Sequence, residues 1–269
     1  MHLKVKNRLF LLLLTSLILA ALVLSLSGCG QSPLKGAVTV GGSTTVQPVA
    51  EKWAKAFETK NANVKITVQG GGSSAGIKGC AEGIFDIGAA SRELKPNEIE
   101  QWPDLKATQI AGDGVAIVVH PSNSTADLSL EKIRDIFAAG SNTEWTVINR
   151  EEGSGTRDCF EEKVMAGAKI APNAEFSPST GAVKQKVAGT TNAIGYISLG
   201  HVDSSVKALS IDGIACSEDN VLNKSYPISR YLNFITKGEP KELTKNFIDF
   251  CLSTEGQNIV KEEGYITIK

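Results

Sequence analysis

The order of apolar and polar positions changes period many times between residues 37 and 264. Short runs rich in valine and isoleucine, which are typical of strands, alternate with stretches whose apolar residues recur every three or four positions, which is typical of helices. In the first part of the chain these runs predict strands at 38–40, 64–68, 84–89 and 114–119 and helices at 46–58 and 75–82. Strands that alternate with helices predict βαβ units around a mostly parallel sheet.

Residues 120–123 (HPSN) interrupt this pattern, and a second set of elements begins after them. Residues 130–139 begin this second α/β set. We predict helices at 156–165 and 182–188, strands at 147–148, 193–197 and 231–235, and two amphipathic helices between 243 and 263. This order predicts an α/β fold with two Rossmann-like lobes, a cleft and crossover strands. The first lobe is expected at 37–117 and 230–269 and the second at 118–229. Clefts between lobes are common sites for small ligands.

The first 28 residues have the anatomy of an export signal. Cationic residues before position 9 precede an apolar run at 9–26, as in a signal peptide. The run ends in LSGC, whose cysteine is Cys29. This sequence resembles the lipobox of prokaryotic lipoproteins, which implies that Cys29 carries a lipid and that 29–36 is a tether on the outer face of the cytoplasmic membrane. The alternative is an uncleaved anchor, since about 18 apolar residues can span a bilayer.

The charge balance and the cysteines narrow the class of protein. Removal of residues 1–28 takes away three cationic residues and no acidic ones, which moves the formal net charge from −1 to −4. A nucleic-acid partner is therefore disfavoured. The four remaining cysteines include no closely spaced pair, which disfavours a zinc site, and outside the cytoplasm they can form up to two disulfides or stay as buried thiols. They are Cys80, Cys159, Cys216 and Cys251.

Three segments share one design, in which a predicted strand leads into a loop of glycines and hydroxyl residues and then into a helix. Such a loop places backbone N–H groups and a hydroxyl at a helix N-terminus, where the helix dipole favours an anion. Each loop alone could be a plain helix cap, since serine and threonine are ordinary N-cap residues. Three together favour a shared oxyanion site. They are Gly41-Gly42-Ser43-Thr44-Thr45, Gly70-Gly71-Gly72-Ser73-Ser74 and Gly153-Ser154-Gly155-Thr156.

Two arginines flank the third loop. Arg150 precedes it by three residues and Arg157 follows it directly. A guanidinium can bind an oxyanion through two charge-assisted hydrogen bonds, each worth about 1.5–3 kcal/mol. The alternative is an exposed arginine paired with a glutamate at 151, 152 or 161. We expect Arg150 to contact the ligand, and the sequence leaves Arg157 open.

The chain resembles the phosphate-binding proteins of ABC phosphate transporters between Val38 and Thr236. The most specific shared element is Arg-x-x-Gly-Ser-Gly-Thr at 150–156. The resemblance implies a two-lobed, periplasmic-binding-protein-like fold of type II that closes on inorganic phosphate and delivers it to the permease subunits of the transporter. We expect a monomer that needs no cofactor and no metal. The other shared elements are 42–45 with Pro48 and Trp53, 72–78, 86–92, 112–115 and 193–197.

The resemblance also implies which residues bind phosphate. The expected ligands from the three loops are Thr44, Thr45, Ser73, Arg150, Ser154, Gly155 and Thr156. Ser91, at the end of a predicted strand, is a further candidate or a simple turn residue. At this position a branch of the family has an aspartate that accepts the proton of hydrogen phosphate. In this chain Asp86 or Asp113 could take over that role. Alternatively, each of these aspartates only caps a turn. Sulfate, molybdate and tungstate are competing ligands.

An enzyme is the alternative from another class. Residues 72–76 match G-x-S-x-G, and a strand before and a helix after would suit a nucleophile elbow at Ser74. A serine hydrolase also needs a histidine base. Beyond residue 28 only His120 and His201 remain, and neither lies in a segment that predicts this role. We therefore expect a binding protein without catalytic activity.

Overall fold

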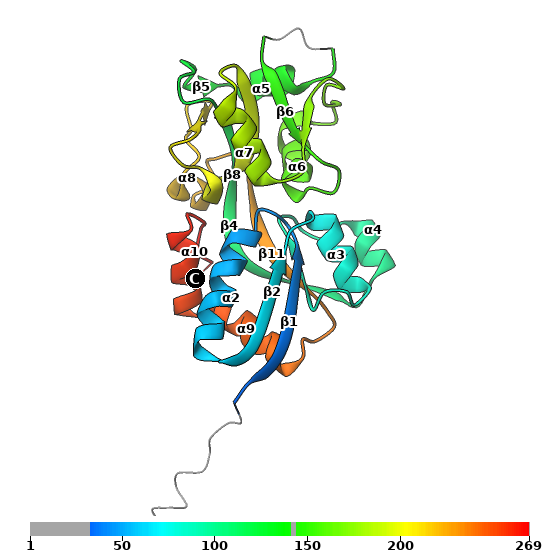
Figure 1. Ribbon diagram of the computed structural model, residues 1–269. Helices are drawn as coiled ribbons and strands as arrows, with labels where there is room; N and C mark the ends of the chain where they lie inside the picture. Colours follow the sequence, from blue (N-terminus) through cyan, green and yellow to red (C-terminus); the bar gives the residue numbers. More distant parts are fainter. Residues whose placement is uncertain (1–32, 141–143, 269) are drawn as a thin grey trace, which may run out of the picture. The chain divides into compact units, whose positions relative to one another are not determined.

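One mixed sheet organises the described part of the chain, with the strand order β2-β1-β3-β11-β4-β8-β6-β7 and β9 beside β4 (Figure 1). The computed structural model describes residues 33–140 and 144–268. The strands are β1 (Lys35–Gly42), β2 (Asn63–Gln69), β3 (Ile87–Ala90), β4 (Leu105–Val119), β6 (Thr146–Arg150), β7 (Glu175–Ser177), β8 (Ala193–Ser198), β9 (Lys207–Ala208) and β11 (Ser229–Lys237). A separate pair consists of β5 (Asp127–Leu128) and β10 (Ser210–Ile211).

Helices connect these strands, as the alternating pattern predicts. They are α2 (Gln47–Lys60), α3 (Ser73–Ala81), α4 (Pro96–Gln101), α5 (Leu130–Phe137), α6 (Gly155–Phe160), α7 (Thr180–Gly189), α8 (Glu218–Leu222), α9 (Glu242–Leu252) and α10 (Thr254–Glu262). A π-helical turn, η1 (Glu161–Met165), continues α6, and a 3-10 turn, η2 (Leu199–His201), follows β8.

Contacts divide the chain into Met1–Leu34 and Lys35–Lys269. The predicted signal segment and Cys29 lie outside the described residues. Among the residues that the structure does describe, no helix is both long and apolar enough to cross a membrane.

Strands β4 and β11 belong to both lobes. The part of β4 from Leu105 to Gly114 pairs antiparallel with β11, and the part from Val115 to Val119 pairs with β8. We call β1–β3 with α2–α4, α9 and α10 the first lobe, and β6–β9 with α5–α8 the second lobe. Figure 1 shows β4 and β11 running side by side from one to the other. The residues at which one lobe ends and the next begins remain a prediction.

The apolar face of α2, formed by Val49, Ala50, Trp53, Ala54 and Phe57, packs against the first lobe's sheet and C-terminal helices. Trp53 is fully buried, meets Phe234 edge-on at 5.8 Å between ring centroids, and donates a hydrogen bond to the carbonyl of Gly256 at 2.8 Å. In the second lobe, Phe160 stacks on Tyr196 with centroids 4.2 Å apart. Because Phe160 is the last residue of α6, this contact fixes the helix against β8 and so positions its first turn.

Some elements differ from the prediction in their bounds. Helix α3 starts at Ser73, so this residue belongs to the first turn and not to the loop. The strand expected from residue 84 starts at Ile87. Ile84 is 62% exposed and so is not part of the buried strand that its apolar side chain suggested. The helix expected at 156–165 changes to π-helical geometry at Glu161.

Candidate functional site

The glycine loops bring strand ends and helix starts unusually close together in the first lobe. Gly42 has φ 132°, and a Cβ there would lie 2.4 Å from the carbonyl oxygen of Ala89 and 2.7 Å from the Cα of Gly76. A Cβ on Gly76 would lie 2.5 Å from the carbonyl oxygen of Gly41. Only glycine fits at such distances. The loops after β1 and β2 are therefore held against β3, with the N-termini of α2 and α3 side by side.

Hydroxyl groups from both lobes meet at these helix starts. The Oγ1 atom of Thr45 lies 3.0 Å from that of Thr156 and 3.1 Å from that of Thr180. The Oγ1 atom of Thr44 accepts a hydrogen bond from the backbone N–H of Thr180 at 3.2 Å. Thr44 and Thr45 precede α2, whereas Thr156 and Thr180 begin α6 and α7. We call Thr44, Thr45, Thr156 and Thr180 the threonine cluster.

Two further hydroxyls, those of Ser73 and Ser91, lie beside Gly155 at the start of α6. We call these two residues the serine pair. Ser91 donates from its backbone N–H to the Oγ atom of Ser73 at 3.0 Å, and the two Oγ atoms are 3.3 Å apart. Both residues are 1% exposed. A Cβ on Gly155 would lie 2.5 Å from the Oγ of Ser73 and 2.8 Å from that of Ser91. The absence of a side chain at Gly155 thus lets the start of α6 pack directly against these hydroxyls.

Arg150 supplies the positive charge of the site. Its side chain is 2% exposed and forms a two-bond fork with Glu151, from Nε to Oε2 and from Nη2 to Oε1, both at 2.8 Å. Nη1 also donates to Thr180 Oγ1 at 3.0 Å, and Nη2 donates to Thr44 Oγ1 at 3.1 Å. Arg150 therefore pairs with a glutamate, as the alternative expected, but it is buried and joins the threonine cluster.

Comparison with known proteins identifies the family. Residues 28–255 match the model of the PBP superfamily domain. The phosphate-binding protein PstS of Bacillus subtilis (strain 168) is 33% identical over 253 residues, which cover 90% of this chain and 84% of the relative. The chain belongs to the PstS phosphate-binding proteins of the PBP superfamily.

Other members of this PstS family agree with that assignment. The phosphate-binding protein PstS of Borreliella burgdorferi is 30% identical over 266 residues, covering 91% of this chain and 94% of the relative. A crystal structure of a phosphate ABC transporter substrate-binding protein from Clostridium perfringens, solved with bound phosphate, is 44% identical with a TM-score of 0.82 and covers 87% of this chain and 100% of its own. The predicted PBP-like fold is confirmed by these neighbours.

Two residues near the third loop have structural contacts. Ser154 is 1% exposed, and its Oγ accepts from the backbone N–H of Arg157 at 3.3 Å, so its hydroxyl caps α6. The Arg157 guanidinium forms no hydrogen bond with the threonine cluster. Its Nε donates to Glu161 at 2.7 Å, its Nη1 donates to the carbonyl of Arg150 at 3.2 Å, and it lies 5.7 Å from the ring centroid of Phe176. Arg157, whose role the sequence left open, is therefore paired with a glutamate, Glu161.

The two aspartates considered as proton acceptors both lie in structural contacts. Asp86 accepts from the backbone N–H and the hydroxyl of Thr39, each at 2.8 Å, at an exposed turn. Asp113 is fully buried in β4, accepts from Ser198 Oγ at 2.6 Å and pairs with Arg230 through Oδ2. Neither carboxylate reaches the threonine cluster or the serine pair, so the expectation that one replaces the family aspartate has no support in this geometry.

The hydroxyl of Ser74 has a structural partner as well. Its Oγ accepts from Arg92 Nη2 at 2.9 Å. Among the described residues, His120 contacts Ser122 and His201 contacts the carbonyl of Thr45, so neither histidine pairs with Ser74. The nucleophile elbow therefore lacks the base that a hydrolase would need.

The four cysteines that can be described are free thiols, so the two possible disulfides are not formed. Burial raises the pKa of Cys159 to about 11 and that of Cys216 to about 12, and it also raises the pKa values of Cys80 and Cys251. In the described ranges, 33–140 and 144–268, no group of three or more histidines, cysteines and carboxylates is placed to hold a metal ion.

Thr180 is the site residue that sequence reasoning missed. It is fully buried and contacts Thr44, Thr45 and Arg150. It follows the same design as the three loops, since β7 leads into Ser179, whose Oγ caps α7 by accepting from Ala182 N–H at 3.0 Å. The sequence signal for this loop was Ser179 and Thr180 before Gly181. It was missed because β7 spans only three residues and so gives no apolar run that would predict a strand before the loop.

Proposed function

We propose that this protein captures inorganic phosphate between its two lobes and delivers it to the permease of an ABC transporter. The observation that supports this most directly is the meeting of Arg150 with hydroxyls from both lobes. Phosphate-binding relatives that cover most of the chain support the choice of ligand.

The proposed ligands are the hydroxyls of the threonine cluster, the serine pair and the guanidinium of Arg150. Hydroxyl groups both donate and accept, so a tetrahedral anion that carries oxygens and at most one or two protons can replace the hydroxyl–hydroxyl contacts. Gly155 and Thr156 begin α6, where backbone N–H groups have no acceptor within the helix and the dipole favours negative charge. The Oγ of Ser154 caps this helix by accepting from the backbone N–H of Arg157, and its O–H is left to donate to the anion.

The site has little net charge. Arg150 carries one positive charge, which Glu151 offsets, so the remaining attraction comes from hydrogen-bond donors in a buried space. Charge-assisted bonds there contribute about 1.5–3 kcal/mol each. Micromolar binding needs about 8 kcal/mol, and the donors of Arg150, the hydroxyls and the helix starts are sufficient for that.

We also propose that the protein is exported and anchored through a lipid on Cys29. The support is the apolar run and the LSGC sequence before the folded unit. Anchoring would keep a monomeric receptor close to the permease on the outer face of the membrane.

A second candidate ligand is another tetrahedral oxyanion, with sulfate the first to test. It is favoured by Ser91, which occupies the position of the family aspartate, and by the structural contacts of Asp86 and Asp113. A site built from hydroxyls does not require a protonated anion.

The test is isothermal titration of residues 31–269 with phosphate at neutral pH, repeated in a large excess of sulfate. We expect phosphate binding that survives the sulfate. Equal competition by sulfate would leave an anion receptor with a different ligand, and no heat with either anion would contradict the proposal altogether.

A further inference from the structure

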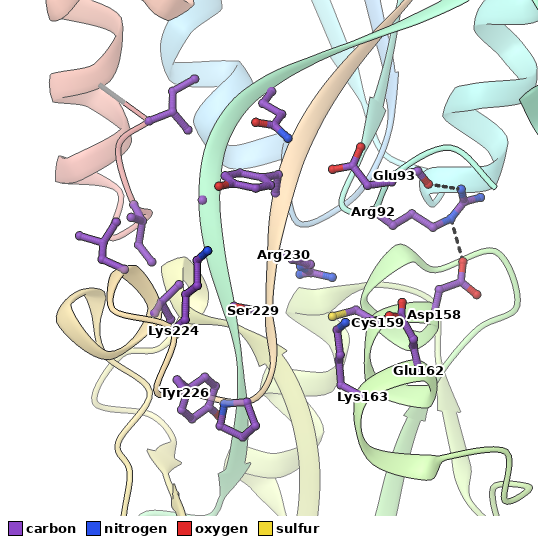
Figure 2. Close-up of a pocket in the computed structure, with 18 of the residues that line it drawn as sticks. Arg92, Glu93, Asp158, Cys159, Glu162, Lys163, Lys224, Tyr226, Ser229 and Arg230 are labelled. Carbon is purple, nitrogen blue, oxygen red and sulfur yellow. Dashed lines mark hydrogen bonds and ion pairs between the residues drawn. The ribbon is translucent and has the colours of Figure 1, made fainter. Parts of the chain in front are cut away.

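A second contact joins the lobes outside the threonine cluster and the serine pair. Nε of Arg92 lies 2.8 Å from Oδ2 of Asp158. Arg92 directly follows Ser91 in the first lobe, and Asp158 is in the first turn of α6 in the second lobe. Figure 2 shows the pair at the edge of a groove with a volume of about 1020 Å³, whose floor is formed by β4 and β11.

The first lobe holds the Arg92 guanidinium in place before Asp158 is considered. Nη1 and Nη2 donate to the two carboxylate oxygens of Glu98 at 2.7 and 2.8 Å. Nη1 also donates to the carbonyl of Glu93 at 2.9 Å, and Nη2 to Ser74 Oγ at 2.9 Å. Burial opposes the charge of Glu98, but the hydrogen bonds from Arg92 and from the Lys95 backbone outweigh it and hold the pKa of Glu98 below its usual value. The Nε edge of Arg92 is thus presented to the second lobe at little further entropic cost.

Asp158 faces two cations of the first lobe. Nζ of Lys95 lies 2.9 Å from the same Oδ2 atom that faces Arg92. Glu98 balances the charge of Arg92, so the charge of Lys95 is left for Asp158. The contact of Oδ2 with Arg92 Nε is an ion pair and not a directed hydrogen bond. Its strength therefore depends on distance and on screening.

Chain connectivity couples this contact to the anion site. Ser91 and Arg92 are adjacent, and Gly155 begins the helix whose first turn contains Asp158. Any movement of α6 away from the first lobe separates Gly155 from the serine pair and Asp158 from Arg92 together. Neither Arg92 nor Asp158 hydrogen-bonds to a residue of the threonine cluster.

We propose that Arg92 and Asp158 are positioning residues that latch α6 against the first lobe and so slow the release of the bound anion. This inference rests on the proposed function. The latch forms only when the lobes meet, so it acts on the closed state. Loss of the Asp158 charge should raise the release rate of phosphate and leave the association rate nearly unchanged.

The experiment compares Asp158→Asn with Asp135→Asn, which removes the same charge from an exposed position on α5. Stopped-flow tryptophan fluorescence measures both rate constants with phosphate. We expect Asp158→Asn to raise koff by about three- to tenfold with kon within about twofold, and we expect Asp135→Asn to match the parent. The difference in koff should shrink in 1 M NaCl, where the screening length is about 3 Å.

A koff for Asp158→Asn equal to that of Asp135→Asn would overturn the latch, and so would a change in kon that matches the change in koff. Failure of the parent to bind phosphate would instead contradict the proposed function. The latch is then tested without ligand by small-angle scattering. Asp158→Asn should have a larger radius of gyration than the parent, and equal radii would overturn the proposal.

Discussion

Arg150 and Arg92 are both buried arginines that form a fork with a glutamate and face the opposite lobe. Their side chains are 2% and 7% exposed, and their partners are Glu151 and Glu98. The two differ in what the remaining donors meet. The spare donors of Arg150 end on the hydroxyls of Thr44 and Thr180. Those of Arg92 end on a carbonyl, on the hydroxyl of Ser74 and beside the carboxylate of Asp158.

This difference separates a binding role from a holding role. A hydroxyl can rotate and exchange its partner for an oxygen of a ligand, so Arg150 is available to an anion. A second carboxylate beside the guanidinium, as Asp158 is for Arg92, repels an anion and fixes the arginine to the protein. Burial and pairing therefore do not distinguish the two, whereas the chemistry of the third partner does.

The largest expected effect comes from removal of Arg150. Arg150→Ala should weaken phosphate binding at least about 100-fold, because two donors of about 1.5–3 kcal/mol each are lost and the carboxylate of Glu151 is left unpaired beside the anion. Isothermal titration measures the affinity, and small-angle scattering should show no compaction with phosphate. Arg157→Ala is the matched control, since Arg157 pairs with Glu161 and contacts Arg150 only at its backbone carbonyl, at 3.2 Å. An Arg150→Ala affinity close to that of the parent would remove Arg150 from the site.

The next effect tests the close packing of Gly155 against the serine pair. Gly155→Ala places a Cβ within 2.5 Å of Ser73 Oγ, so we expect a loss of about 1–3 kcal/mol in binding from overpacking. Gly181→Ala is the control, because it lies in the first turn of α7 and its Cβ would meet only Ser179 Oγ at 3.9 Å. Titration with phosphate and a thermal melt of both variants separate lost binding from lost stability. If Gly155→Ala binds as well as Gly181→Ala, the close packing of α6 against the serine pair is not needed for phosphate binding.

Much of the proposed anion site could be predicted from local sequence. A strand, a glycine loop and a hydroxyl at a helix start fall within a few neighbouring residues, so Thr44, Thr45, Ser73 and Thr156 could be found without knowledge of the fold. The pairing of β1 with its parallel neighbours β2 and β3 then places the ends of these strands at one edge of the sheet. Ser91 was found for a similar reason, at the end of a buried strand.

The remaining features depend on contacts between distant segments. Asp113 could be judged only once Arg230 and Ser198 were placed beside it. The contact between Arg92 and Asp158 joins two lobes and leaves no pattern in the sequence. The sequence allowed Arg157 either to contact the ligand or to pair with Glu161 one helical turn later. Only the direction of its side chain in the structure distinguishes the two.

A smaller effect sharpens the role of hydroxyls beside Arg150. Thr180→Val keeps the shape of the side chain and removes the acceptor of Arg150 Nη1. One neutral hydrogen bond contributes about 1 kcal/mol, so we expect about a fivefold weaker affinity for phosphate. Thr190→Val, at the other end of α7, should bind like the parent. Equal affinities for the two variants would show that Thr180 does not contact the ligand and only supports Arg150.

The smallest expected effect concerns acid sensitivity where the lobes meet. His201 and Tyr265 both contact the carbonyl of Thr45, at 3.3 and 2.5 Å. Burial lowers the pKa of His201 below its usual value of 6.5, although the Thr45 carbonyl and the charge of Asp113 oppose the shift. As the pH falls below about 6.5, the unfolded chain binds a proton before the folded chain does, so stability decreases.

Urea unfolding at pH 7.0 and 5.5 measures this dependence, which for one group does not exceed about 1.4 kcal/mol per pH unit. His201→Gln keeps a donor for Thr45 and removes the titration, so its stability should change less over this range. The lowered pKa of Glu98 contributes stability that is lost only as the pH falls below that group's usual range near 4.5, so the latch should not add to the change between pH 7.0 and 5.5. An identical loss in the parent and in His201→Gln would assign the acid sensitivity to other groups.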